Sequence, residues 1–370
     1  MGLQIEQCAD LLYGTLQKFE KNQFQIALKH QTAEVVNRWF KKDKMVLDGG
    51  DQVNFYLQLK NSNNASHTRL YDTDNVNVAN VISEGSVKWT HAKTAWAFDI
   101  RALAMNKGNS TRVFNMLESR VKAAYHDFVN LLEEAAWKTP ASSTDDMNPH
   151  GIAAWLVQSD ADNETGDFTG YVGDYTTADD SESAYSTVGG LACTSTSNAR
   201  WANWYADHNN NLDYSLLKLL RRGFRKTKFQ TPTIAGKALD PESSFYNFRF
   251  YTSSAVLDAL EDMALKADDR VGADLGKYAG AVVFKGIPFI YVDELDTELT
   301  YVRGADPIYG VNHSHFKPIV LSGNNFRTTK PTPKGGSHNV LEGFVDLSYA
   351  YVCGNRRAGG FLISDWEGSN

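Results

Sequence analysis

Residues 51–105 constrain the fold more than any other part of the chain, because two strand patterns there flank a long polar loop. In the first pattern, apolar residues alternate with polar ones over residues 53–59. In the second, Trp96, Phe98 and Ile100 alternate with Ala, Asp and Arg. A period of two is typical of a strand with one buried face. A two-stranded ribbon is only marginally stable in water by itself, so another surface has to cover it.

The loop between the two patterns is too polar and too long for the turn of a compact hairpin, since loops beyond about 12–15 residues are uncommon. Residues 61–66 and 72–75 consist almost entirely of Asn, Ser, Asp and Thr. Two interpretations are open. The segment is a projecting arm that docks on another copy of the chain, or it is a hairpin that lies on its own domain.

A long helix is predicted directly after this segment, because apolar residues recur there every three or four positions. Ser110, after Asn109, is a suitable N-cap, and the helix is expected to end before Pro140. About 28 residues at 1.5 Å each give a rod of roughly 42 Å. Such a helix serves as a structural beam or as an ordinary long core helix. The apolar positions are Val113, Met116, Leu117, Val121, Ala124, Phe128, Leu131 and Ala135.

The composition is that of a globular protein with two or three domains, since 42% of the 370 residues are hydrophobic and 22% are charged. No apolar run reaches the ~20 residues that cross a bilayer, and the first residues lack a signal-peptide pattern, so a cytosolic product is expected. A net charge of −7 excludes general nucleic-acid binding by the whole chain. Cys8, Cys193 and Cys353 have no metal or redox spacing and are expected to be buried thiols.

The remaining segments give an α+β pattern. Residues 1–42 are typical of short helices, and residues 141–198 of short strands with polar loops. Helices are also predicted at 212–224 and 253–265. Strands are predicted at 248–251, 281–284, 289–292, 308–311, 316–321, 340–347, 349–353 and 361–363.

Several cations follow or end the helix predicted at 212–224. Cations at a helix C-terminus suit the helix dipole. Alternatively, they form an inward-facing basic patch, or they contact an acidic neighbour. The residues are Arg221, Arg222, Arg225, Lys226 and Lys228.

Motifs for catalysis or metal binding are scarce. His313 and His315 would place two imidazoles on one face of a strand, a half-site for a metal, but no third ligand stands at a recognisable spacing. The acidic residues from Asp160 fail the calcium-loop pattern, because Thr165 and Tyr171 stand where it has Gly and Glu. Nucleophile-elbow, zinc-protease, phosphate-loop and dinucleotide motifs do not occur in the sequence. Binding or building is therefore favoured over turnover.

Three stretches of the second half resemble a known family. Residues 281–292 (AVVFKGIPFIYV) read as a strand, a Gly-x-Pro bend and a strand, residues 307–312 (PIYGVN) lead into the final sheet, and residues 351–357 (YVCGNRR) lie near the end. With the order of helical arm, extended loop, long helix, mixed lobe and terminal strands, they resemble the major capsid protein of tailed bacteriophages, the fold named after phage Hong Kong 97. The motifs cover about residues 245–365, and the remainder matches only in the order of its elements.

The resemblance implies a division of the chain. Residues 1–42 would be the N-terminal arm, 43–106 the extended loop, and 140–306 the axial domain with a polar insertion. Residues 107–139 and 307–370 would form the peripheral domain with its spine helix. A long N-terminal scaffolding extension is not seen, which implies a separate scaffolding protein.

The resemblance also implies a function. The chain would be a structural coat protein, not an enzyme and without a cofactor, that assembles in the host cytoplasm into hexamers and pentamers of an icosahedral virion shell around double-stranded DNA. Expected partners are further copies of the chain, a scaffolding protein, a portal and a decoration protein, with weak inner-surface contact to DNA and no membrane. Two alternatives stay open: an encapsulin-like compartment shell, and a metal-dependent hydrolase that uses His313 and His315.

A shell subunit works by burying area against several neighbours, and aromatic and arginine side chains carry much of such binding energy. Candidate contact residues follow from this. For the tryptophans the alternative is packing on their own domain, and for the two arginines it is a solvated charge at a strand end instead of a pair with a neighbour's carboxylate. The candidates are Phe55, Tyr56, Leu57, Trp89, Trp96, Phe98, Arg356 and Arg357.

Overall fold

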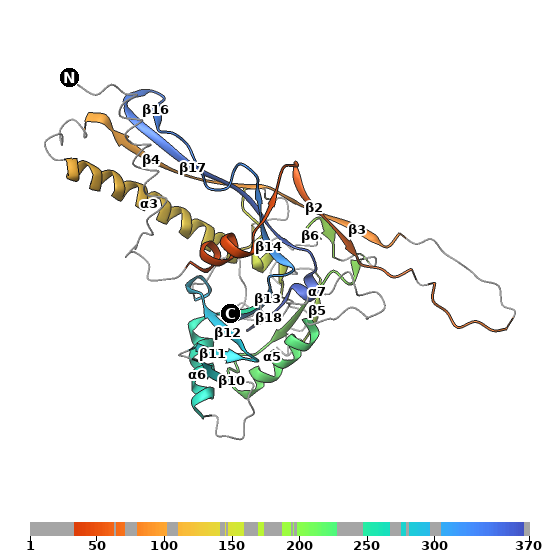
Figure 1. Ribbon diagram of the computed structural model, residues 1–370. Helices are drawn as coiled ribbons and strands as arrows, with labels where there is room; N and C mark the ends of the chain where they lie inside the picture. The colour runs from red at the N-terminus through yellow and green to blue at the C-terminus, as the bar shows by residue number, and fades with distance from the viewer. Residues whose placement is uncertain are drawn as a thin grey trace, which may run out of the picture. The chain divides into compact units, whose positions relative to one another are not determined.

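The computed structural model (Figure 1) divides into two compact units, each assembled from three stretches of sequence. The first unit takes its described residues from Met1–Gly49, Thr90–Glu134 and Ile319–Tyr349, and the second from Gly50–Trp89, Ala135–Pro318 and Ala350–Asn370. Helices and strands occur in both units, which confirms the α+β class. The structure describes residues 33–62, 64–70, 80–101, 110–140, 145, 147–158, 169–173, 187–193, 195, 198–227, 247–266, 275–278, 281–296 and 305–365.

The sheet of the first unit is built around one long strand, β17 (Ser337–Cys353). All of strand β4 (Thr90–Asp99) pairs antiparallel with the Val340–Tyr349 part of β17. Strands β14 (Phe316–Leu321), β15 (Arg327–Thr328) and β16 (Thr332–Lys334) also pair with β17, and β1 (Met45–Leu47) lies parallel to β14. The sequence predicts two strands where β17 is continuous. The strand continues because neither Gly nor Pro interrupts it at Ser348, which is fully buried.

The predicted long helix is confirmed as α3 (Ser110–Trp137). It runs along β4 in the first unit (Figure 1), where Thr94 Oγ1 donates to the Ala124 carbonyl over 3.2 Å. Phe128 lies in the core as predicted, whereas Leu131 is 46% exposed and Leu132 takes the buried position beside it. Residues spaced by three and four share one face of a helix, so a shift of one position moves a side chain to the rim of that face.

A short helix, η1 (Val35–Asp43), packs into the core of the first unit. The Phe40 ring meets Phe326 at 6.0 Å and Tyr349 at 5.6 Å, both edge to face. The Val35 N–H donates to the carboxylate of Glu133, at 3.0 Å. Within the described part of residues 1–42, the predicted helical face of Val35 and Phe40 is therefore buried; the helices predicted before residue 33 lie outside the described residues.

The second unit contains a mixed sheet of eight strands in the order β10-β11-β12-β9-β13-β18-β8-β5. Pairs β12·β9 and β18·β8 are parallel, and β13 lies antiparallel between β9 and β18. The predicted bend at residues 285–288 is the β11–β12 turn, where Gly286 has φ +78°. The strands are β10 (Leu275–Tyr278), β11 (Ala281–Phe284), β12 (Ile287–Tyr291), β9 (Phe248–Thr252), β13 (Ala305–Asn312), β18 (Gly360–Asp365), β8 (Asn203–Asp207) and β5 (Thr169–Val172).

Two helices, α5 (Tyr214–Thr227) and α6 (Ser254–Lys266), cover one face of this sheet. Their apolar residues share a single core with Phe250, Phe361 and other side chains of that face. Tyr251 and Tyr309 point to the opposite face, where the Trp137 ring lies 5.1 Å and 6.3 Å from them. Among the helices that the structure describes, none combines the length and apolarity needed to cross a bilayer.

The strand pairing of the ribbon differs from the prediction. Strand β2 (Gln52–Gln58), the first predicted pattern, pairs antiparallel with β3 (Ile82–Lys88), from Gln52↔Lys88 to Gln58↔Ile82. The second predicted pattern is β4, which belongs to the sheet of the first unit. The sequence analysis missed β3 because its residues, ISEGSVK, contain a central glycine and few apolar side chains.

Candidate functional site

The base of the β2–β3 ribbon is held in the second unit by three rings, Phe55, Trp155 and Trp201, which we call the aromatic anchor. Phe55, on β2, lies 6.2 Å from Trp155 and 6.1 Å from Trp201. The two tryptophans meet edge to face at 6.3 Å, and both are buried. Aromatic pairs in this range add about 0.5–1.5 kcal/mol beyond the burial of their area. The anchor thus fixes one face of the ribbon to the segment around α4 (Ile152–Trp155).

Glycines make room for the anchor. Gly85 of β3 stands opposite Phe55, and a Cβ there would lie 2.4 Å from the Phe55 ring. Gly189, with φ +59°, turns the hairpin of β6 (Thr187–Val188) and β7 (Leu191–Ala192), and a Cβ there would lie 2.7 Å from Trp155. The Gly189 carbonyl accepts the Ser86 N–H at 3.0 Å. The hairpin turn and the ribbon therefore approach each other through backbone atoms.

Arg356 lies against the anchor and is fully buried. Its Nε donates to the Trp155 carbonyl at 2.8 Å, and its Nη1 donates to the Trp201 carbonyl at 3.0 Å. The guanidinium carbon is 5.7 Å from the centre of the Trp201 ring. One side chain thus holds the backbone of both anchor tryptophans.

Arg356 makes further contacts, including one from Nη1 to Cys193 Sγ at 3.5 Å. Nη1 also donates to the Gly173 carbonyl at 2.6 Å, and Nη2 donates to Asn203 Oδ1 at 2.9 Å. Asn203 in turn bonds the Val157 backbone in both directions, at 2.8 and 3.1 Å. The planar fork of arginine suits several acceptors at once. The expectation that Arg356 pairs with a neighbour's carboxylate or is a solvated charge is therefore wrong, because α7 (Arg356–Gly359) turns this side chain inward.

Arg357, the next residue, points elsewhere. It is partly exposed, and its guanidinium carbon lies 4.0 Å from the centre of the Tyr171 ring, a cation–π contact. Its backbone N–H is accepted by Asn355, the N-cap of α7. Contact between Arg357 and a neighbouring copy stays a prediction.

The other candidate contact residues differ in how far their side chains are buried. Tyr56 is 70% exposed on the outer face of the ribbon, and Leu57 is half-buried. Trp89 is buried and donates from Nε1 to the Gly50 carbonyl at 2.9 Å, which closes the base of the ribbon. Trp96 and Phe98 of β4 are buried in the first unit, as the alternative of packing on their own domain describes. Of the candidates, Tyr56 offers the largest exposed fraction to a neighbour.

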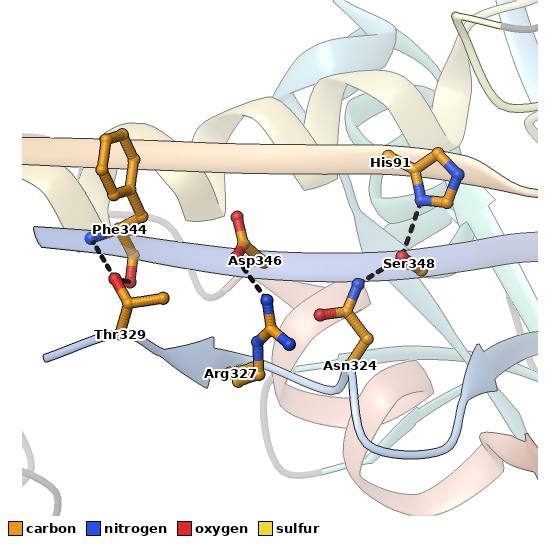
Figure 2. A network of polar contacts seen from close by, with 7 residues as sticks. All are labelled: His91, Asn324, Arg327, Thr329, Phe344, Asp346 and Ser348. Atoms are coloured by element: carbon orange, nitrogen blue, oxygen red, sulfur yellow. Dashed lines mark hydrogen bonds and ion pairs between the residues drawn. The ribbon is translucent and has the colours of Figure 1, made fainter.

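A chain of polar contacts joins residues 324–329 to β17 in the first unit (Figure 2). Ser348 Oγ contacts His91 Nδ1 at 2.7 Å and accepts from Asn324 Nδ2 at 2.5 Å. The Thr329 hydroxyl donates to the Phe344 carbonyl and accepts the Phe344 N–H, at 3.2 and 2.9 Å. An ion pair of Arg327 with Asp346, at 3.3 Å, lies between them and is largely exposed, so it adds little. This network fixes the segment after β14 and has the character of a structural support.

The predicted metal half-site is not formed. His313 and His315 lie in the turn between β13 and β14, not on a strand. His313 is buried, and its Nε2 is 2.8 Å from the Tyr251 hydroxyl. Burial, and then the charge of Lys317, lower the pKa of His315. In the described ranges no group of three or more His, Cys, Asp or Glu side chains could hold a metal ion.

The cysteine prediction is confirmed where the structure tests it. Cys193 and Cys353 are buried thiols, and burial raises the pKa of Cys353 to about 12. A thiol with so high a pKa is a poor nucleophile and behaves as a small apolar side chain. Cys8 and the acidic loop from Asp160 to residue 168 lie outside the described residues.

Sequence reasoning missed Trp155 and Trp201, which hold the ribbon. Trp155 stands within the stretch of residues 141–198 that reads as short strands and polar loops, and Trp201 follows it directly. Large aromatic side chains within a polar segment are a signal of local burial, because each buries 150–250 Å². That signal was available in the sequence.

The chain is similar to known proteins in its structure and not detectably in its sequence. No family model matches the sequence, and no curated protein does. The chain is similar to the cyanophage A-1(L) capsid asymmetric unit, with a TM-score of 0.62 and 12% identity over 94% of this chain and 96% of that chain. It is also similar to the capsid of the native GTA particle, with a TM-score of 0.52 and 10% identity over 94% of this chain and 95% of that chain. A third similar structure is the mature capsid of bacteriophage PhiM1, with a TM-score of 0.50 and 10% identity over 93% of this chain and 90% of that chain.

At identities this low, the matches show only the fold. They cover nearly the whole chain. The chain has the fold of phage capsid subunits.

Proposed function

We propose that this chain is the major capsid protein of a tailed bacteriophage, with the fold named after phage Hong Kong 97. It is a structural protein, not an enzyme, and it assembles into hexamers and pentamers of an icosahedral shell around double-stranded DNA. The observation that carries the proposal is the match to the cyanophage A-1(L) capsid over 94% of the chain. Its location is the virion, after assembly in the cytoplasm of the bacterial host.

The proposed division of the chain follows the capsid fold. Residues 1–42 serve as the N-terminal arm, the extended loop lies within 43–106, and 140–306 form the axial domain with a polar insertion. Residues 107–139 and 307–370 form the peripheral domain, with α3 as its spine. Exposure of the ribbon supports the loop role, since residues 60–62 and 64–70 are exposed and Leu70 is 86% exposed.

The proposed partners are further copies of the chain, a separate scaffolding protein, a portal and a decoration protein, with weak contact to packaged DNA. A shell of this kind needs no active site, because interfaces of about 1,200 Å² or more, repeated under closed symmetry, stabilise the whole although each is modest. Among the contact candidates Tyr56 is largely exposed, and Phe55, Leu57 and Arg357 are partly exposed. An inner-surface contact with DNA has to be local, since the net charge is −7.

Negative-stain microscopy of the purified chain, with and without a scaffolding protein, tests the proposal. Hollow, closed particles of uniform size are expected. A chain that stays a monodisperse monomer under all assembly conditions would overturn it. Particles that copurify with an enzyme cargo and exclude DNA would instead identify a protein compartment.

A second experiment tests the extended loop separately from the shell. Residues 60–80 are replaced by Asn-Gly, a two-residue turn that closes an antiparallel pair, so that Leu59 and Val81 flank it. The variant is expected to fold and to lose assembly. A control in which residues 60–70 become a Gly/Ser linker of equal length keeps the span but removes the side chains. Normal shells from both variants would contradict the loop role and leave the shell function intact.

A further inference from the structure

Helix α5 carries a stripe of positive charge along its solvent face. Lys218, Arg222, Arg225 and Lys226 are exposed at successive turns, and residues 214–227 contain no Asp or Glu. The helix dipole accounts for Arg225 and Lys226 in the last turn, but its effect ends within that turn and does not reach Lys218 or Arg222. Like charges one turn apart repel each other, so the stripe does not stabilise the isolated helix. A partner with negative charge would stabilise this surface of the helix.

Lys285 and Arg357 extend the basic surface beyond the helix. The Lys285 ammonium lies 5.2 Å from the Phe224 ring of α5. Arg357 stacks on Tyr171, whose hydroxyl donates to the Lys226 carbonyl at 3.4 Å. Two cations from outside the helix, one in the β11–β12 turn and one in α7, therefore adjoin α5. In a chain with a net charge of −7, this is a local reversal of sign.

Helix α6 carries the opposite charge. Asp258 and Asp262 are exposed one turn apart, and Glu261 lies between them, half-buried. Asp296, next to the start of α6, accepts the Ser254 N–H at 2.6 Å. Its other oxygen accepts the Tyr291 hydroxyl, also at 2.6 Å.

The phenol of Tyr291 donates to two carboxylates, Asp296 at 2.6 Å and Asp293 at 3.3 Å. Its pKa is raised, first by the hydrogen bond to Asp296, then by burial, and then by the charges of Asp296 and Asp293. The acidic character of this side therefore extends from α6 to η4 (Asp293–Leu295).

The two charged surfaces lie over opposite halves of one sheet face. Both helices share one core, but α5 contacts β8 and β18, whereas α6 contacts β10 to β13. The strand order places β8 and β5 toward one edge and β10 and β11 at the other. Figure 1 shows the two helices side by side, with α6 toward the β10 end of the strand order and α5 toward the β5 end.

This distribution of charge favours one way of pairing two copies of the chain over another. A twofold pairing that put α5 on α5, or α6 on α6, would face like charges across an interface, which is strongly unfavourable. A head-to-tail pairing puts α5 of one copy against α6 of the next, and repetition of one rotation closes a ring. We propose that the basic face of α5 docks on the acidic face of α6 in a neighbouring copy of this chain, and that this contact closes the capsomer rings.

The inference rests on the proposed function, since it requires copies arranged in rings, and a charge swap tests it. One variant is Arg222→Glu with Arg225→Glu, a second is Asp258→Lys with Glu261→Lys, and a third combines all four changes. Each reversal alone is expected to lower the particle yield at least ~10-fold at low salt, because like charges then meet at every contact. The combined variant restores complementarity and is expected to recover assembly.

The matched control is Lys93→Glu with Lys334→Glu, which changes the net charge as the first variant does but on exposed residues of the first unit. It is expected to assemble as the unaltered chain does. Circular dichroism of each unassembled variant verifies folding. Should a reversal fail to fold, Arg222→Gln with Arg225→Gln neutralises the stripe and is expected to lower the yield less steeply.

The outcomes separate the two proposals. If the unaltered chain forms shells and both reversals do so equally well, the α5–α6 contact is refuted and the shell function stands. Reversals that assemble normally but retain less DNA would also refute it and would assign the basic face to nucleic acid. A folded combined variant that does not recover would refute the pairing. An unaltered chain that forms no particle would refute the shell function itself.

Discussion

Arg356 and Arg357 are adjacent in sequence and occupy opposite environments. Arg356 is enclosed by carbonyls of Trp155, Gly173 and Trp201, whereas Arg357 lies over the ring of Tyr171 near the surface. The sequence indicates two cations near a strand end but not which one turns inward. That choice depends on acceptors about 150 to 200 residues earlier in the chain, which no local pattern contains.

Replacement of Arg356 by Met is expected to destabilise the unassembled chain by about 3 kcal/mol, because several buried carbonyls lose their donor at once. Arg357→Met is the matched control and is expected to cost about 0.5–1 kcal/mol, the worth of a partly exposed cation–π contact. Urea unfolding followed by circular dichroism measures both. Equal costs for the two variants would show that Arg356 does not support the anchor.

At the scale of elements, periodicity succeeded where one face is continuously apolar. Strands β2 and β4 and helix α3 lie where the patterns predict them. Pairing was not predictable in the same way, because hydrogen bonds between strands leave no trace in the period of either strand. Strand β3 escaped notice since Gly85, which makes space for Phe55, interrupts its pattern.

Gly85→Ala is expected to loosen the ribbon. The added methyl group would overlap the Phe55 ring, and such overpacking costs typically about 1–3 kcal/mol. Amide hydrogen exchange should then accelerate in β2 and β3 more than in the eight-stranded sheet. Gly49→Ala is the control, because a Cβ at Gly49 meets nothing within 4 Å and should leave exchange unchanged. Protection of β2 and β3 that survives Gly85→Ala would contradict the role of the close contact.

At the scale of the whole molecule, the fold joins segments that are distant in sequence. The sheet of the second unit places β13 and β18 between strands that end at residues 252 and 207. Local patterns locate these strands but do not specify their order, which depends on long-range packing. The capsid-type fold was predicted from a resemblance in order and motifs, and the structure comparison confirms it.

Stability of the unassembled chain is expected to fall as the pH drops below about 6.5. Burial lowers the pKa of His150 and of His315 in the folded state, so the unfolded chain binds protons first. The stabilising effect is therefore complete above the unfolded pKa and is lost as the pH falls from there toward the folded pKa. Urea midpoints between pH 7.5 and 5 measure this slope. A variant with His150→Gln and His315→Gln should have a shallower slope than the unaltered chain, and equal slopes would contradict the assignment.

The two tryptophans around Phe55 give the ribbon an intrinsic optical reporter. Indole emission shifts to longer wavelength when water reaches the ring, and Trp155 and Trp201 are buried with Phe55 packed against both. Release of the ribbon would hydrate both indoles and redden the emitted light. Spectra recorded during shell formation would then reveal, without any label, whether the ribbon stays seated as neighbours engage it.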